Sequence, residues 1–68
     1  MLNTRKIKAR MVELGLTQVD IAAALKIAPA TMSQKINGIR PLHLHEAQIV
    51  AVVLKIDDAS FGDYFFTR

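Results

Sequence analysis

The sequence has no cysteine, only three glycines and two prolines, and no apolar run near the roughly 20 residues that a membrane-spanning helix needs. The lack of cysteine excludes disulfide scaffolds, thiolate zinc sites and thiol catalysis, and it fits a reducing cytosol. No apolar stretch follows the basic N-terminal residues, so we expect no secretory signal and no membrane partner.

The length of 68 residues limits what the chain can do. It predicts a single domain over residues 1–68. The walls of a ligand pocket of about 300–1,000 Å³ would take up most of such a domain, so we expect neither an enzyme nor a small-molecule ligand. The hydrophobic fraction of 51% excludes a disordered tail and suggests that apolar surface is left over for a partner.

Charge is unevenly distributed along the chain. Residues 1–40 carry seven Lys or Arg and two Asp or Glu. Residues 41–68 carry two Lys or Arg and four Asp or Glu. The first part therefore has a net charge of +5 and the second of −2. A basic first part indicates an acidic partner, most commonly the polyphosphate backbone of a nucleic acid.

Apolar residues recur at helical spacing along the chain, and no stretch alternates with period two. The pattern predicts a compact all-α bundle of five helices. We expect them from Asn3 or Thr4 to Leu14, from a cap at Thr17 to the 26–28 connection, and over residues 29–36, 44–55 and 58–65.

Residues suited to helix ends support these boundaries. Gly15 fits the left-handed position after the first helix, and Thr17 with Asp20 forms a Thr-x-x-Asp capping box for the second. Pro29 fits the first position of the third helix, where its missing N–H has no cost. Asp57 is the expected N-cap of the last helix.

The segment from Thr17 to Gly38 reads TQVDIAAALKIAPATMSQKING, which predicts two short helices joined by a three-residue turn. This is a helix-turn-helix unit. Small Ala22 and Ala23 allow a close crossing, which Ile27 and Met32 fill. The outward residues of the second helix then suit a DNA major groove, where a Gln can read an adenine edge; they are Ala30, Thr31, Ser33, Gln34 and Asn37.

This unit resembles the Cro/CI-type, lambda-repressor-like helix-turn-helix regulators of phages and mobile elements. The resemblance lies in T-Q-x-D-I-A-x-x-L followed by I-x-x-x-T-M-S-x-K-I-N-G, and it extends through GIRPLHLHEAQIVAVVL to the final DYFF. It implies a five-helix domain that binds a pseudo-palindromic double-stranded DNA site as a homodimer. We expect a transcriptional repressor on the nucleoid, in the cytoplasm of a bacterial or phage-infected cell.

The resemblance also implies the site residues. Base contacts are expected from the start and middle of the third helix, at Pro29, Ala30, Thr31, Ser33 and Gln34. Phosphate contacts are expected from the second helix, from residues 35–40 and from the basic first helix, at Thr17, Gln18, Lys35, Asn37, Arg40 and Arg10. Many relatives bury an Arg–Glu pair where this sequence has Met11 and Ile36, an apolar replacement that leaves the function unchanged.

Other polar residues indicate no metal, cofactor or catalytic site. His43 and His45 are two residues apart, so on a helix they would point about 200° apart and could not share an ion. We expect His43 to start the fourth helix and His45 to lie on the surface. The carboxylates at Glu46, Asp57, Asp58 and Asp63 fit helix caps and solvated charges better than acid–base catalysis.

The fourth helix has two apolar stripes. One is expected in the core and comprises Ala47, Val50, Ala51 and Leu54. The other lies opposite and predicts an isologous dimer interface with the C-terminal tail, formed by Ile49, Val52, Val53, Ile56 and Phe66. Burial of this stripe by the last helix of the same chain is the other interpretation. The alternative function is a protein-interaction module, antitoxin-like or adaptor-like, that uses this apolar surface.

Overall fold

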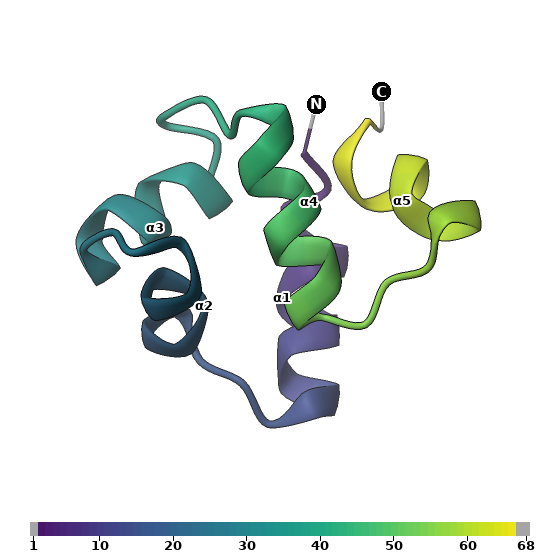
Figure 1. The fold of residues 1–68 in the computed structure, drawn as a ribbon, viewed down its shortest axis with the longest axis horizontal. Helices are drawn as coiled ribbons and strands as arrows, with labels where there is room; N and C mark the ends of the chain where they lie inside the picture. The colour runs from purple at the N-terminus through teal and green to yellow at the C-terminus, as the bar shows by residue number, and fades with distance from the viewer. Residues whose placement is uncertain (1, 67–68) are drawn as a thin grey trace.

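Five α-helices and no strand make up residues 2–66, the part of the chain that the computed structural model describes (Figure 1). The predicted all-α architecture is confirmed, and four of the five helices have the predicted boundaries. The helices are α1 Thr4–Leu14, α2 Gln18–Leu25, α3 Pro29–Ile36, α4 Leu44–Val53 and α5 Asp58–Phe65.

A residue with positive φ follows the end of helices α1, α2 and α4. These residues are Gly15 at 69°, directly after α1, Lys26 at 59°, directly after α2, and Lys55 at 55°, two residues after α4. At each end the next N–H donates to a carbonyl of the last helical turn, as Ile56 N–H does to Ala51 O at 2.9 Å. The reversal at Lys55 stops α4 at Val53, two residues before the predicted end.

The core is one apolar cluster to which all five helices contribute. Figure 1 shows α1 and α4 in the middle of the molecule, α2 and α3 on one side and α5 on the other. Met11 and Ile36 are 5% and 1% exposed and both belong to this apolar cluster. Ala23 is exposed, and Ala22 alone provides the small buried residue of α2.

The two apolar stripes of α4 differ in burial. The predicted core stripe is buried, with Ala47, Val50, Ala51 and Leu54 at most 6% exposed. The opposite stripe is divided: Val53 and Ile56 pack against the core, whereas Val52 is 77% exposed. The second stripe is therefore partly buried within the domain and partly at the surface.

Arg10 has a structural role that differs from the predicted phosphate contact. Its Nε donates to Leu54 O at 2.9 Å and its Nη2 to Lys55 O at 3.3 Å. These carbonyls form the C-terminal end of α4, where the helix dipole favours a positive charge. Its Nη1 also lies 3.5 Å from Glu13 Oε2. The guanidinium is thus engaged within the fold.

We expect Arg10→Ala to lower the free energy of unfolding by about 1–2 kcal/mol, because two carbonyls lose a charged donor at a partly exposed site. Urea unfolding measures this change, and Arg5→Ala is the matched control because Arg5 is an exposed arginine of the same helix. DNA affinity of the folded variant should be unchanged. Equal stability of the two variants with weaker DNA binding by Arg10→Ala would instead support the phosphate contact.

Candidate nucleic-acid interface

A reciprocal cap fixes the start of α2. Thr17 N–H donates to Asp20 Oδ2 at 2.8 Å, and Asp20 N–H donates to Thr17 Oγ1 at 3.4 Å. Hydrogen bonds from the Thr17 backbone and hydroxyl hold the pKa of Asp20 below its ordinary value. The Thr17 hydroxyl, a predicted phosphate ligand, is thus used inside the cap. Gln18 follows as the first, half-buried residue of α2.

The outward side of α3 begins with two exposed residues, Pro29 and Ala30. The N-cap residue Ala28 is extended and makes no side-chain cap, so no side chain covers the first N–H groups of α3. Ser33 and Gln34 continue this side one helical turn later and are half-buried. Thr31 is also half-buried. The five residues predicted for base contacts therefore all retain surface, most of it at the start of α3.

Asn37 links the end of α3 to α1. Its Nδ2 donates to Ser33 O at 2.9 Å, and its Oδ1 accepts from Lys8 Nζ at 2.9 Å. Thr4 Oγ1 on α1 also donates to Ile36 O at 2.6 Å. The exposed ammonium of Lys8 therefore lies beside the predicted phosphate ligand Asn37.

Lys8 lies at the candidate interface, whereas the sequence favoured Arg10 among the basic residues of α1. The spacing of Thr4 and Lys8, four residues apart on one side of α1, is the signal that could have found it. Lys6 is engaged elsewhere: its Nζ lies 4.8 Å from the Tyr64 ring centre and 4.0 Å from Asp63. Among the basic residues of α1, Lys8 is thus the one that the structure brings to α3.

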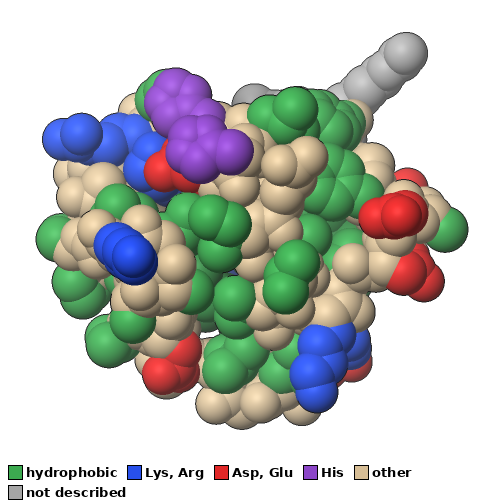
Figure 2. Space-filling model, viewed as in Figure 1, with side chains coloured by type: hydrophobic (Ala, Val, Ile, Leu, Met, Phe, Trp, Pro, Cys, Tyr) green, Lys and Arg blue, Asp and Glu red, His purple; other side chains and the backbone are tan. Residues whose placement is uncertain are grey.

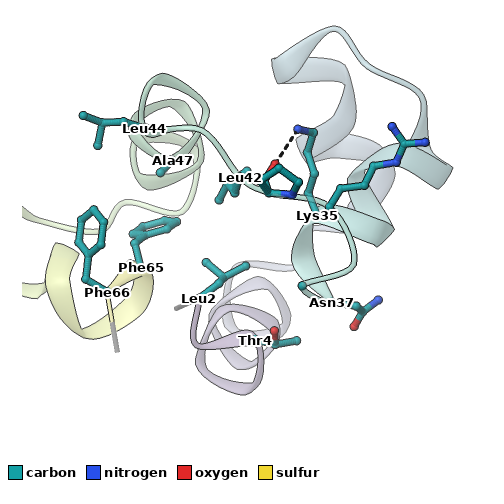
Figure 3. Close-up of a pocket in the computed structure, with 12 residues that line it drawn as sticks. Leu2, Thr4, Lys35, Asn37, Leu42, Leu44, Ala47, Phe65 and Phe66 are labelled. Carbon is teal, nitrogen blue, oxygen red and sulfur yellow. Dashed lines mark hydrogen bonds between the residues drawn. The ribbon is translucent and has the colours of Figure 1, made fainter. Parts of the chain in front are cut away.

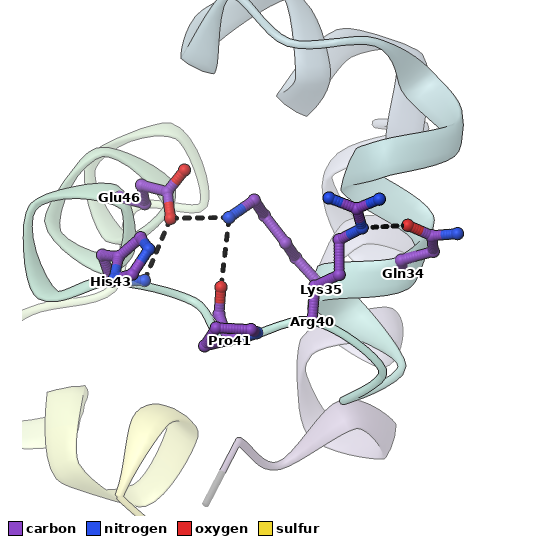
Figure 4. A network of polar contacts seen from close by, with 6 residues as sticks. All are labelled: Gln34, Lys35, Arg40, Pro41, His43 and Glu46. Atoms are coloured by element: carbon purple, nitrogen blue, oxygen red, sulfur yellow. Dashed lines mark hydrogen bonds and ion pairs between the residues drawn. The ribbon is translucent and has the colours of Figure 1, made fainter.

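Gln34 and Arg40, predicted for base and phosphate contacts respectively, touch each other (Figure 4). Arg40 Nε donates to Gln34 Oε1. The backbone N–H groups of Ile39 and Arg40 also donate to Gln34 O, at 2.8 and 3.2 Å. The loop after α3 therefore folds back onto the helix, and it carries an exposed arginine beside the outward glutamine.

Lys35 is buried and its ammonium is engaged within the domain, so the structure does not favour its predicted phosphate contact. The residue is 9% exposed, and its Nζ donates to Glu46 Oε1 at 2.9 Å and to Pro41 O at 3.1 Å. Glu46 Oε1 also accepts from His43 N–H at 3.0 Å (Figure 4). The ammonium thus joins α3, the following loop and the first turn of α4.

Glu46 provides the negative counter-charge for the buried Lys35 ammonium. Burial raises the pKa of Glu46, but the His43 N–H and the Lys35 ammonium lower it by more, so the pKa lies below its ordinary value. The sequence reasoning placed Glu46 among caps and solvated charges. It is a cap residue, and it is also the buried partner of Lys35.

His43 and His45 lie closer together than predicted. Their rings are nearly parallel, with centroids 6.2 Å apart. The expected separation of about 200° applies to two helical residues, whereas His43 is the extended N-cap of α4. No group of three or more potential metal ligands occurs within residues 2–66.

A pocket of about 440 Å³ lies between the start of α1, the loop after α3 and α5 (Figure 3). A pocket of this size does therefore fit the domain, contrary to the expectation from chain length. Its apolar wall includes Leu2, Leu42 and Phe65, and Gly38 and Arg40 lie at its border. The outward residues Pro29, Ala30 and Ser33 do not line the pocket, but Asn37 and Arg40 do, so it adjoins the candidate interface only at the end of α3.

Charge is unevenly distributed over the molecule. Figure 2 shows acidic side chains at the right, over α5, and Lys and Arg side chains at the upper left, on the side of α3; acidic side chains also lie at the lower left, and further Lys or Arg side chains at the lower right. Residues 29–40 contain no Asp or Glu. No helix within the described chain is long and apolar enough to cross a bilayer.

Comparison with protein families matches residues 7–61 to the family described as "Helix-turn-helix". No curated protein and no solved structure gives a significant match. The chain belongs to the Cro/CI-type, lambda-repressor-like helix-turn-helix family. It is a DNA-binding transcriptional regulator of that class, and the family is one of DNA-binding domains rather than enzymes.

The Lys35–Glu46 pair predicts acid-sensitive stability. Because the pKa of Glu46 is lower in the folded state, its contribution is complete above the ordinary glutamate pKa and is lost as the pH falls through that value toward the folded one. We expect Glu46→Gln to lower the free energy of unfolding by about 3 kcal/mol at neutral pH, because it leaves a buried ammonium without its counter-charge.

Urea unfolding of both proteins at neutral pH and near pH 4 tests this pH dependence. The difference between wild type and Glu46→Gln should shrink at the lower pH, since only the wild type loses a charge at this position. Asp58→Asn removes an exposed carboxylate of α5 and serves as the control for general acid effects. A difference that stays constant with pH would contradict the assignment.

Proposed function

We propose that the chain is a sequence-specific repressor of the phage type that places α3 in the major groove of duplex DNA. The observation that carries this proposal is the outward side of α3, which is exposed at Pro29 and Ala30 and adjoins no acidic residue between positions 29 and 40. Small side chains at this end allow the helix backbone to approach the base edges. Repression follows if the bound protein occupies a promoter on the nucleoid.

Phosphate contacts fix the position of α3 on the duplex. Gln18 lies at the start of α2, and Asn37 lies at the end of α3. Lys8 adds an exposed positive charge that is held 2.9 Å from the Asn37 side chain. The residues Pro29, Ala30, Thr31, Ser33 and Gln34 face the bases, and Gln34 has the longest side chain among them.

We further propose a homodimer formed through the exposed apolar residues of α4 and the end of α5. Val52 is 77% exposed and Phe66 60% exposed, and Ile49 and Leu44 extend the same apolar surface. Figure 2 shows hydrophobic side chains along the front of the molecule, where α4 lies. An isologous interface there would pair two copies of α3 for a pseudo-palindromic site.

A protein-interaction module is the second candidate function. The exposure of Val52 and Phe66 favours it equally, because a different protein could cover the same apolar surface. The two functions differ in what they require of DNA: an adaptor or antitoxin-like module needs no preferred sequence.

Selection from a random duplex library at two salt concentrations tests the main proposal. A regulator should enrich one sequence at both concentrations, with affinity falling as salt rises because phosphate contacts release counterions. Gln34→Ala should relax the preference at one base position and lower the binding free energy by about 1–3 kcal/mol. Enrichment of no sequence would exclude sequence-specific binding and leave the interaction module.

Val52→Glu tests the dimer. A buried, unpaired carboxylate in the interface is strongly unfavourable, so the sedimenting mass should fall from two chains to one. Val12→Glu is the matched control, because Val12 is 80% exposed on α1 and lies outside the proposed interface. A mass that is the same for wild type and Val52→Glu would exclude this interface.

A further inference from the structure

Gln34 and Arg40 are held side by side by the backbone. Both Ile39 N–H and Arg40 N–H donate to the carbonyl oxygen of Gln34, which fixes the start of the Arg40 side chain next to α3. The two side chains then meet through Arg40 Nε and Gln34 Oε1. Their proximity therefore does not depend on the exposed side-chain hydrogen bond alone.

The residue after Arg40 is also held in place. Pro41 has a restricted φ, and its carbonyl accepts from the buried Lys35 ammonium at 3.1 Å. Lys35 is in turn paired with Glu46, which also accepts the His43 N–H of the same loop. Buried polar groups thus position Arg40 from the core side, while its side chain remains exposed (Figure 4).

The chemistry of the two side chains fixes what they can offer to a base. An arginine has donors only, so it can bond to a glutamine only through the amide oxygen. This contact fills one of the two lone pairs of the Gln34 amide oxygen and turns that oxygen toward Arg40, so the NH₂ group points away from the arginine (Figure 4). In this arrangement the groups presented beside each other are the Gln34 NH₂ group and the terminal N–H groups of Arg40, all of which are donors.

A donor-only pair distinguishes between the bases in the major groove. Guanine presents two neighbouring acceptors, N7 and O6, whereas adenine presents the N7 acceptor next to the N6 donor. A free glutamine matches adenine, but a glutamine whose oxygen is turned toward the arginine places its NH₂ donor against the adenine amino group. Guanine satisfies the available donors of the pair.

We propose that Arg40 is a specificity-determining residue that reads guanine jointly with Gln34, rather than a phosphate contact as the family resemblance implied. This inference rests on the proposed function, since it requires α3 in the major groove. It replaces the adenine preference expected for Gln34 alone.

The test uses the full chain and the sequence obtained by selection. The base position that Gln34→Ala relaxes is identified first. Four duplexes that differ only at this position are then ranked by fluorescence anisotropy with wild type, Arg40→Ala and Lys8→Ala. Circular dichroism melting confirms that each variant is folded, which we expect because Arg40 and Lys8 are exposed.

Wild type should prefer guanine over adenine by about 5- to 150-fold. Arg40→Ala should abolish that preference or reverse it toward adenine, because the Gln34 oxygen becomes available. Lys8→Ala should weaken all four duplexes by the same factor, since it removes a phosphate contact only.

Two results would overturn the inference while leaving the proposed function intact. One is a wild-type preference for a base other than guanine at this position, which decides the matter even if Arg40→Ala binds too weakly to rank the duplexes. The other is an Arg40→Ala variant that weakens all four duplexes equally and keeps the wild-type preference. Failure of wild type to select any sequence would instead refute the proposed function, and this inference with it.

Discussion

The buried ion pair between Lys35 and Glu46 is the interaction on which the arrangement of the proposed DNA-facing side depends. Its ammonium bonds to a carboxylate on α4 and to the Pro41 carbonyl, and the carboxylate also accepts the His43 N–H. Three consecutive segments, α3, the following loop and the first turn of α4, are therefore fixed by one pair of charges. Without this ion pair, the loop after α3 would keep its hydrogen bonds to Gln34 O. It would lose the polar link that the Lys35 ammonium makes between the Pro41 carbonyl and Glu46 on α4.

A buried ion pair is a costly way to join two helices, because both charges lose their hydration. The chain uses an apolar contact at Met11 and Ile36, and it places its buried pair between α3 and α4. An apolar pair at Lys35 and Glu46 would fill the space as well, but it could not bind the Pro41 carbonyl. The main effect of the buried charge is therefore to hold the loop at Pro41, rather than to stabilise the core.

Most of the fold could be predicted from the sequence because its boundaries are set locally. The capping box at Thr17, the proline at the start of α3 and Asp57 before α5 act within one helical turn, so their effects can be read from neighbouring residues. The outward residues of α3 follow from the same helical period once Met32 and Ile36 are known to be buried.

The roles of the charged residues could not be predicted in the same way, since they depend on contacts between distant segments. Arg10 bonds to carbonyls 44 and 45 residues away, and Lys8 bonds to a side chain 29 residues away. The composition of α1 shows that the helix is basic. It does not show which of its basic side chains contacts which residue of the other helices. The separation of about 200° expected between His43 and His45 on a helix does not apply, because His43 lies just outside α4.

The separation of charge and apolar surface suggests how one small domain could serve two partners at once. Asp58 and Asp63 on α5 are exposed and would be repelled by phosphate, so DNA is favoured on the α3 side. The exposed Val52 lies on α4, outside the α2–α3 unit, where a second protein surface can pack without displacing DNA. Because α4 also holds Glu46, a change in how its first turn packs would reach the Arg40 loop through Lys35. The same ion pair therefore connects the apolar helix to the residues proposed to face the bases.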